Sequence, residues 1–154
     1  MIQVLFLDTG PLGLLTHPQR SAEVIAITDW LSEYLLTGGR VFVPAIVYYE
    51  LKRELLRARK ATSIARLDTF VDARAGRYVP LSDEALRLAA DLWAKARQKG
   101  QPTAEVKAID VDVIIAAQAS TFRADSAELV VATTNVKHLA QFIVAKHWRE
   151  ISPT

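Results

Sequence analysis

The sequence predicts an α/β fold built on a parallel sheet. Residues 2–7 form an almost wholly apolar run that is closed by Asp8, a hydroxyl, a glycine and a proline. A short apolar run ended by turn residues is typical of a strand buried on both faces, and such strands belong to parallel sheets covered by helices. Further along the chain, short apolar runs alternate with longer helical patterns, which is the α/β signature. The 154 residues are expected to form one domain, 1–154.

Composition excludes several classes of protein. The chain contains no cysteine, so it has no disulfide framework and no thiolate chemistry, which fits the reducing cytoplasm. No apolar stretch reaches the roughly 18 residues of a membrane span, and no basic region precedes the first apolar run as a signal peptide requires. We therefore expect a cytoplasmic protein without a membrane contact. The net charge of +2 is too small to name a partner.

The remaining strands are expected where apolar runs meet turn residues. Proline at the third of these strands predicts an edge position. The expected strands are 41–43, 78–81, 128–132 and a last one between 142 and 151, placed at 148–151.

Helices are expected between the strands from periodicity and capping residues. Ser21 and Ser82 are predicted N-caps, and one helix follows directly after Pro44. The segment 100–107 is the most loop-like part of the chain. The other expected helices are 11–16, 21–36, 62–73, 83–99, 110–119 and 136–140, and the helix up to 99 is given the stripe Leu86, Ala89, Ala90, Trp93 and Ala96.

Four polar positions are expected to share one edge of the sheet. In open parallel sheets the ligand lies beyond the carboxyl ends of the strands. Asp8 follows the first strand, and Glu50 lies one to two turns into the helix after the second. Asp110 or Asp112 begins a buried helix, and Asn135 follows the fourth strand.

Three of these positions also have a purely structural interpretation. Asp8 is a good N-cap for the next helix, and Asn135 suits a turn. Glu50 can pair with Arg53, three residues further along the same helix. At 100° per residue Glu50 lies at the rim of the apolar stripe and not on the solvent face.

The third position is divided between two acids. Asp110 and Asp112 stand about 200° apart on a helix, so only one of them can point into a common site. Both could simply favour the helix N-terminus through its dipole. The helix after Asp112 is apolar nearly all round, however, and a buried carboxylate needs a partner or a metal.

Three acids and an amide at one edge predict a site for Mg²⁺ or Mn²⁺, which take oxygen ligands. That favours phosphodiester chemistry. A basic stretch on the helix of Glu50 is placed to take a phosphate backbone, although it is equally well a solvated helix face. The stretch consists of Lys52, Arg53, Arg57, Arg59 and Lys60, of which the first three are the predicted phosphate contacts.

Other catalytic motifs are absent from the sequence. There is no Gly-x-Gly-x-x-Gly, no phosphate-binding Gly-Lys-Ser/Thr loop and no Gly-x-Ser-x-Gly elbow. The histidines His17, His138 and His147 lack zinc spacing. His138 follows Asn135 by nearly one helical turn, and we take it as a structural or surface residue.

The chain resembles the PIN domain family, and more narrowly the VapC-like toxins of bacterial type II toxin–antitoxin pairs. The segments that carry the resemblance are Leu-Asp-Thr at 7–9, Tyr-Glu-Leu at 49–51, Asp-Val-Ile-Ile-Ala-Ala at 112–117 and Val-Ala-Thr-Thr-Asn-Val-Lys-His-Leu at 131–139. They run in order over nearly the whole chain.

The resemblance implies a three-layer α/β/α sandwich on a parallel sheet of about five strands. It also implies a Mg²⁺- or Mn²⁺-dependent endoribonuclease with RNA as substrate, a small antitoxin protein as partner, and a homodimer. By position it assigns metal binding to Asp8, Glu50 and Asp112. Asn135 takes the fourth catalytic position, where many members have Asp, and Thr9 and Thr133 match the supporting hydroxyls.

Two other functions remain open from the sequence. A non-catalytic PIN-like module that binds RNA or a protein would carry the same fold with an imperfect acid cluster. A phosphotransfer enzyme with Asp8 as nucleophile is the weaker alternative, since Asp8-Thr9-Gly10 supplies no second acid.

Overall fold

The computed structural model describes residues 3–99, 106–123 and 128–153. In these ranges five strands form one sheet with the order β3-β2-β1-β4-β5, and every paired neighbour runs parallel. The strands are β1 (Gln3–Leu7), β2 (Arg40–Pro44), β3 (Tyr78–Val79), β4 (Glu128–Thr133) and β5 (Ala145–His147). The predicted parallel five-stranded sheet is confirmed.

Strand β1 lies at the centre of the sheet, between β2 and β4. All four residues from Val4 to Leu7 are fully buried, as expected for a strand covered on both faces. Because β1, β2 and β4 run parallel, their carboxyl ends meet at one edge of the sheet. We call this the carboxyl edge, and the opposite one the amino edge.

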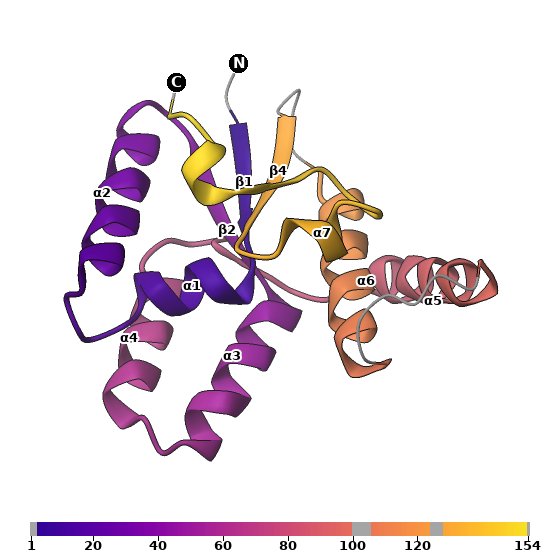
Figure 1. Cartoon of the computed structure of the whole chain (residues 1–154), viewed down its shortest axis with the longest axis horizontal. Helices are drawn as coiled ribbons and strands as arrows, with labels where there is room; N and C mark the ends of the chain where they lie inside the picture. Colours follow the sequence, from indigo (N-terminus) through magenta and orange to yellow (C-terminus); the bar gives the residue numbers. More distant parts are fainter. Residues whose placement is uncertain (1–2, 100–105, 124–127, 154) are drawn as a thin grey trace.

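Helices cover both faces of the sheet. Figure 1 shows α2 and α6 on opposite sides of it, with α5 beyond α6, and this is the α/β/α sandwich. Helices α3 and α4 extend past the carboxyl edge (Figure 1). The helices in the described ranges are α1 (Thr9–Leu15), α2 (Ala22–Leu36), α3 (Ala45–Arg57), α4 (Ala61–Asp72), α5 (Asp83–Gln98), α6 (Val106–Thr121), α7 (Val136–Leu139) and the 3₁₀ turn η1 (Trp148–Glu150).

The predicted helix starts at the two serines are confirmed. The Ser21 hydroxyl accepts a hydrogen bond from the backbone N–H of Val24, and the Ser82 hydroxyl accepts one from Ala85. Pro44 ends β2 and is also the N-cap of α3, so strand and helix are joined without a loop. In the described parts of the chain no helix has the length and apolarity to cross a membrane.

Two helices begin earlier than predicted. Helix α6 begins at Val106, so Asp112 lies in its second turn and not at its start, and the predicted loop is wrong at 106–107. Residues 100–105 of that loop lie outside the described ranges. Helix α1 begins at Thr9 because the Asp8 carboxylate already accepts the Thr9 N–H.

The last strand lies inside the predicted interval 142–151, but its placement at 148–151 is wrong. Residues Trp148–Glu150 form η1, and the last strand is the earlier β5. Trp148 is buried against the indole of Trp30, with ring centroids 5.7 Å apart. An apolar residue that is buried in a turn gives the same sequence pattern as one in a buried strand. Strand β3 holds the predicted edge position but is shorter than the expected 78–81.

The predicted apolar stripe of α5 is also wrong at two positions. Leu86 and Ala90 are exposed, while Ala85 and Ala89 are buried against α6. The small alanine side chains allow the two helices to approach closely. The sequence pattern had favoured the larger Leu86 as the inward residue.

Candidate active site

The carboxyl edge brings together the three predicted acids. Asp8 stands at the end of β1, Glu50 on α3 and Asp112 on α6. Burial, followed by the negative charges of Asp8 and Glu50, raises the pKa of Asp112 from 3.8 to about 7. Asp8 and Glu50 therefore lie close enough to Asp112 for their negative charges to disfavour its ionisation.

Asp8 is held by hydrogen bonds at both carboxylate oxygens. Oδ1 accepts the backbone N–H of Thr9 at 2.7 Å, and Oδ2 accepts the hydroxyl of Thr133 at 2.7 Å. Its own N–H donates to the carbonyl of Ala132 on β4. Burial raises the pKa of Asp8, whereas the hydrogen bonds from Thr133 and Thr9 lower it. Asp8 is therefore both the N-cap of α1 and a member of the acid cluster.

Thr9 links the first two acids. Its hydroxyl donates to Oε1 of Glu50, while its backbone N–H donates to Asp8. The other Glu50 oxygen lies 3.9 Å from an Arg53 nitrogen, so the ion pair foreseen as the structural alternative is present at long range. The Glu50 side chain is 25% exposed, which confirms the predicted position at the rim of the apolar stripe.

Thr133 ties the fourth position to the first. It is fully buried, and its hydroxyl both donates to Asp8 and accepts the backbone N–H of Asn135 at 2.9 Å. Asn135 itself is exposed and makes no side-chain cap for α7. Close approach of α1 completes this corner, since a Cβ added at Gly10 would lie 2.5 Å from the Thr134 hydroxyl.

The choice between the two acids of α6 is resolved by burial. Asp110 is exposed, while Asp112 is partly buried and faces the other carboxylates. The predicted 200° separation accounts for this difference.

The structure adds two residues that the sequence did not assign to the site. Nδ1 of His138 lies 3.9 Å from an oxygen of Asp112. Its signals in the sequence were the spacing after Asn135 and its place in the segment 131–139. Gln118, on α6 with Asp112, is buried and accepts the Ile46 N–H on α3 at 3.2 Å, so it fixes the two acid-bearing helices together. No sequence pattern marked Gln118.

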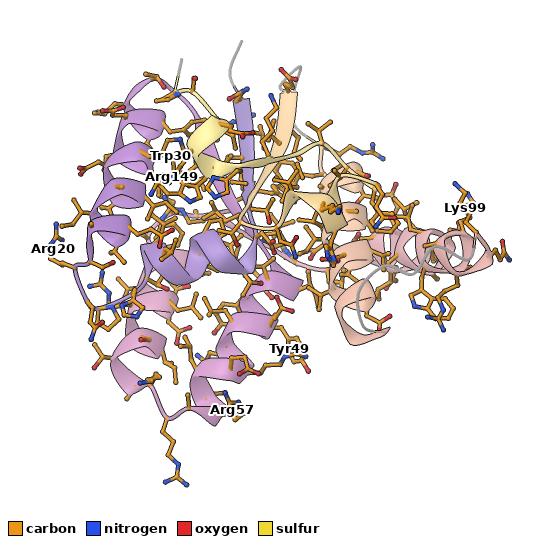
Figure 2. The ribbon with its side chains drawn as sticks, in the orientation of Figure 1. Arg20, Trp30, Tyr49, Arg57, Lys99 and Arg149 are labelled. Atoms are coloured by element: carbon orange, nitrogen blue, oxygen red, sulfur yellow. The ribbon has the colours of Figure 1, made fainter. Side chains whose placement is uncertain are left out.

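The predicted phosphate-binding residues of α3 are engaged with neighbouring groups. Lys52 pairs with Asp68 of α4 at 2.8 Å, and Arg57 pairs with Glu54 at 3.0 Å. Figure 2 shows Arg57 at the far end of α3 from the sheet. Of the three, Arg53 lies nearest to the acids, through its approach to Glu50.

The donor set fits a hard divalent cation. All three side chains offer carboxylate oxygens, the ligands that hard divalent cations prefer, and burial raises the pKa of both Asp8 and Asp112. Within the described ranges no three acidic or imidazole side chains form a group that could hold a metal ion as they stand. Mg²⁺ usually keeps several of its waters, so these acids would bind it in part through water.

Comparison with known proteins places this geometry in a family. The model of the PIN domain matches residues 5–139. VapBC2 from Rickettsia felis, solved bound to a DNA fragment from its promoter, has a similar fold, with a TM-score of 0.68, 19% identity and coverage of 95% of this chain and 99% of that one. VapBC-1 from nontypeable Haemophilus influenzae has a TM-score of 0.65 and 17% identity, with coverage of 96% of this chain and 100% of that one. FitAcB from Neisseria gonorrhoeae has a TM-score of 0.59 and 23% identity, with coverage of 96% of this chain and 99% of that one. The chain matches none of the curated proteins with which it was compared.

Proposed function

The chain belongs to the PIN domain family, and on that premise we propose that it is a Mg²⁺- or Mn²⁺-dependent endoribonuclease. The observation that carries the proposal is the cluster of Asp8, Glu50 and Asp112 at the carboxyl edge, in which each acid comes from a different element. Phosphodiester hydrolysis is the chemistry that such an oxygen-rich, electron-donating site supports once a divalent ion is bound.

Each acid has a part in that reaction. Asp8, Glu50 and Asp112 would hold the ion directly or through water. A bound divalent ion supplies activation of a water molecule and stabilisation of the charge that develops on the phosphate. Thr133 and Thr9 orient two of the carboxylates by donating hydrogen bonds to them, and the bonds to Asp8 favour its charged form.

Asn135 is proposed to orient a water or a substrate group. It brings no charge to the fourth position, so the site carries one negative charge fewer than family members with Asp there. Its backbone is anchored by Thr133, while its side chain is exposed at the edge and available to substrate. Arg53, 3.9 Å from Glu50, is the basic residue best placed to meet an RNA phosphate there.

We also propose that the chain is the toxin of a toxin–antitoxin pair in the cytoplasm. The similar structures are of VapBC and FitAB complexes, some of them bound to DNA, and the similarity covers at least 95% of this chain in each case named above. A small antitoxin protein that covers the carboxyl edge and a homodimer of this chain are the partners we expect.

Cleavage of a mixed RNA pool tests the nuclease. We expect cleavage with Mg²⁺ or Mn²⁺ and none with chelator. The cleavage rate should fall at least about 100-fold in Asp8→Asn and in Asp112→Asn, because removing the charge of a ligand weakens binding of the metal ion. Asp110→Asn is the matched control on the same helix, since that acid is exposed, and it should retain activity.

Two results would argue against the proposal. Cutting that survives both site substitutions would place the activity elsewhere or in a contaminant. Folded protein that neither cuts RNA nor binds Mn²⁺ by calorimetry would favour the non-catalytic module that binds RNA or a protein partner.

A further inference from the structure

A polar cavity lies at the amino edge of the sheet. It has a volume of about 240 Å³ and is lined by residues from the end of α2, the start of β2 and the segment that leads from α4 into β3. Strand β2 separates it from the carboxyl edge, and a five-residue parallel strand spans about 13 Å. The cavity is thus distinct from the acid cluster.

Three arginines line this cavity and no acid does. They are Arg40 at the start of β2 and Arg74 and Arg77 before β3. None of the three takes part in an ion pair with any residue in the described ranges. Three positive charges around one small cavity without a counter-ion repel one another, and an anion would relieve that repulsion.

Arg77 is the least usual of the three, because it is buried. It is 6% exposed, Nη1 donates to the carbonyl of Phe70 at 2.9 Å, and its guanidinium lies 4.5 Å from the centre of the Phe70 ring. Its Nε is buried and has no hydrogen-bond partner in the described part of the chain. A buried charge with an unused donor is costly unless something pairs with it.

The surroundings hold Arg77 in this position. Its N–H donates to the carbonyl of Arg74, and its own carbonyl accepts the N–H of Val43 on β2 at 2.7 Å. Gly76 between the two arginines has a φ of +81°, a conformation that glycine adopts without strain. Burial and the charge of Arg74 both lower the pKa of Arg77, as expected for cations brought together without an anion.

We propose that this arginine cavity is a binding site for a small phosphate dianion, either inorganic phosphate or the terminal phosphate of a nucleotide. The guanidinium fork matches phosphate oxygens, and Arg40 and Arg74 are exposed at the rim where an incoming dianion meets them first. The small volume excludes most larger ligands from full burial. This inference does not depend on the proposed nuclease activity.

Calorimetric titration with chelator present, at constant ionic strength, tests the site. We expect inorganic phosphate and a nucleoside 5′-monophosphate to bind the wild type, and the unphosphorylated nucleoside not to bind. Arg74→Gln and Arg40→Gln, both exposed, should weaken binding at least about tenfold by removing a charge-assisted hydrogen bond. Arg20→Gln is the matched control, since Arg20 is exposed in the segment between α1 and α2 (Figure 2) and should leave binding unchanged.

The remaining arms separate the alternatives. Asp8→Asn should bind phosphate as the wild type does, which would place the site away from the acid cluster. Equal binding of chloride, sulfate and phosphate, or an equal loss in Arg20→Gln, would overturn the proposal in favour of general charge attraction. Tighter binding of a 5′-hydroxyl RNA oligonucleotide, lost in Arg74→Gln, would replace it with backbone phosphodiester binding. No binding of phosphate at all would also overturn it.

Discussion

Replacing Asp112 by asparagine should stabilise the metal-free protein at pH 8. Burial and the charges of Asp8 and Glu50 raise the pKa of Asp112 from 3.8 to about 7, and its side chain is only 18% exposed. Such a difference corresponds to about 4 kcal/mol of unfolding free energy when the group is fully ionised. Asparagine keeps the shape and removes the charge, so we expect a gain of about 1–4 kcal/mol at pH 8.

The pH dependence of the unfolding free energy is a second test of the same effect. The folded-state pKa lies above the unfolded value, so the stability contributed by the protonated Asp112 is fully present below pH 3.8 and is lost as the pH rises through about 7. Between pH 5 and pH 8 the wild type should lose about 2–3 kcal/mol more than Asp112→Asn. Urea unfolding with chelator at the two pH values measures this difference.

Asp110→Asn serves as the control for this prediction, and added Mn²⁺ gives a second measurement. Asp110→Asn should behave like the wild type, because Asp110 is exposed. Mn²⁺ at about 100 times its Kd should stabilise the wild type by about 2.7 kcal/mol and Asp112→Asn by clearly less. If Asp112→Asn is no more stable than the wild type at pH 8, the three carboxylates do not repel one another as described, and the reasoning fails.

Three further substitutions probe the supports of the site and the fold. Thr133→Val removes the hydrogen bond to Asp8 and should lower RNA cleavage at least about tenfold while the protein stays folded by circular dichroism; unchanged cleavage would show that the hydroxyl does not orient the acid. Gly39→Ala places a Cβ against the ring of Tyr34 and should cost about 1–3 kcal/mol in urea unfolding. Gln118→Leu leaves partly buried backbone groups of α3 and β3 unpaired and should cost about 1–3 kcal/mol, with a parallel loss of cleavage that a merely peripheral residue would not cause.

The acid cluster could be predicted from the sequence because each acid follows a clear local pattern. Asp8 ends an apolar run, and Glu50 lies at a fixed angle from the stripe of its helix. For α6 the sequence limited the choice to Asp110 or Asp112, and only the packing of that helix decided it. The supporting role of Gln118 joins residues 72 and 39 positions apart, and no local pattern reports such a contact.

The predictions that failed concern segments whose sequence fits more than one structure, or carries no pattern at all. Helix α5 packs through Ala85 and Ala89, and alanine is a weak marker of an inward face compared with Leu86. Trp148 is buried in a 3₁₀ turn, so its burial says nothing about strand geometry. The arginine cavity has no sequence signature, because Arg40 and Arg77 approach only when β2 and β3 pair.

The order of the strands in the sheet also sets when the site can exist during synthesis on the ribosome. Asp8 leaves the ribosome early, but its hydroxyl partner Thr133 is 125 residues later, and β1 cannot complete its pairing until β4 has been made. At about 5–20 residues per second, the growing chain carries Asp8 for roughly 6–25 s before that partner is even translated. The proposed nuclease therefore has no assembled centre while most of it is being made.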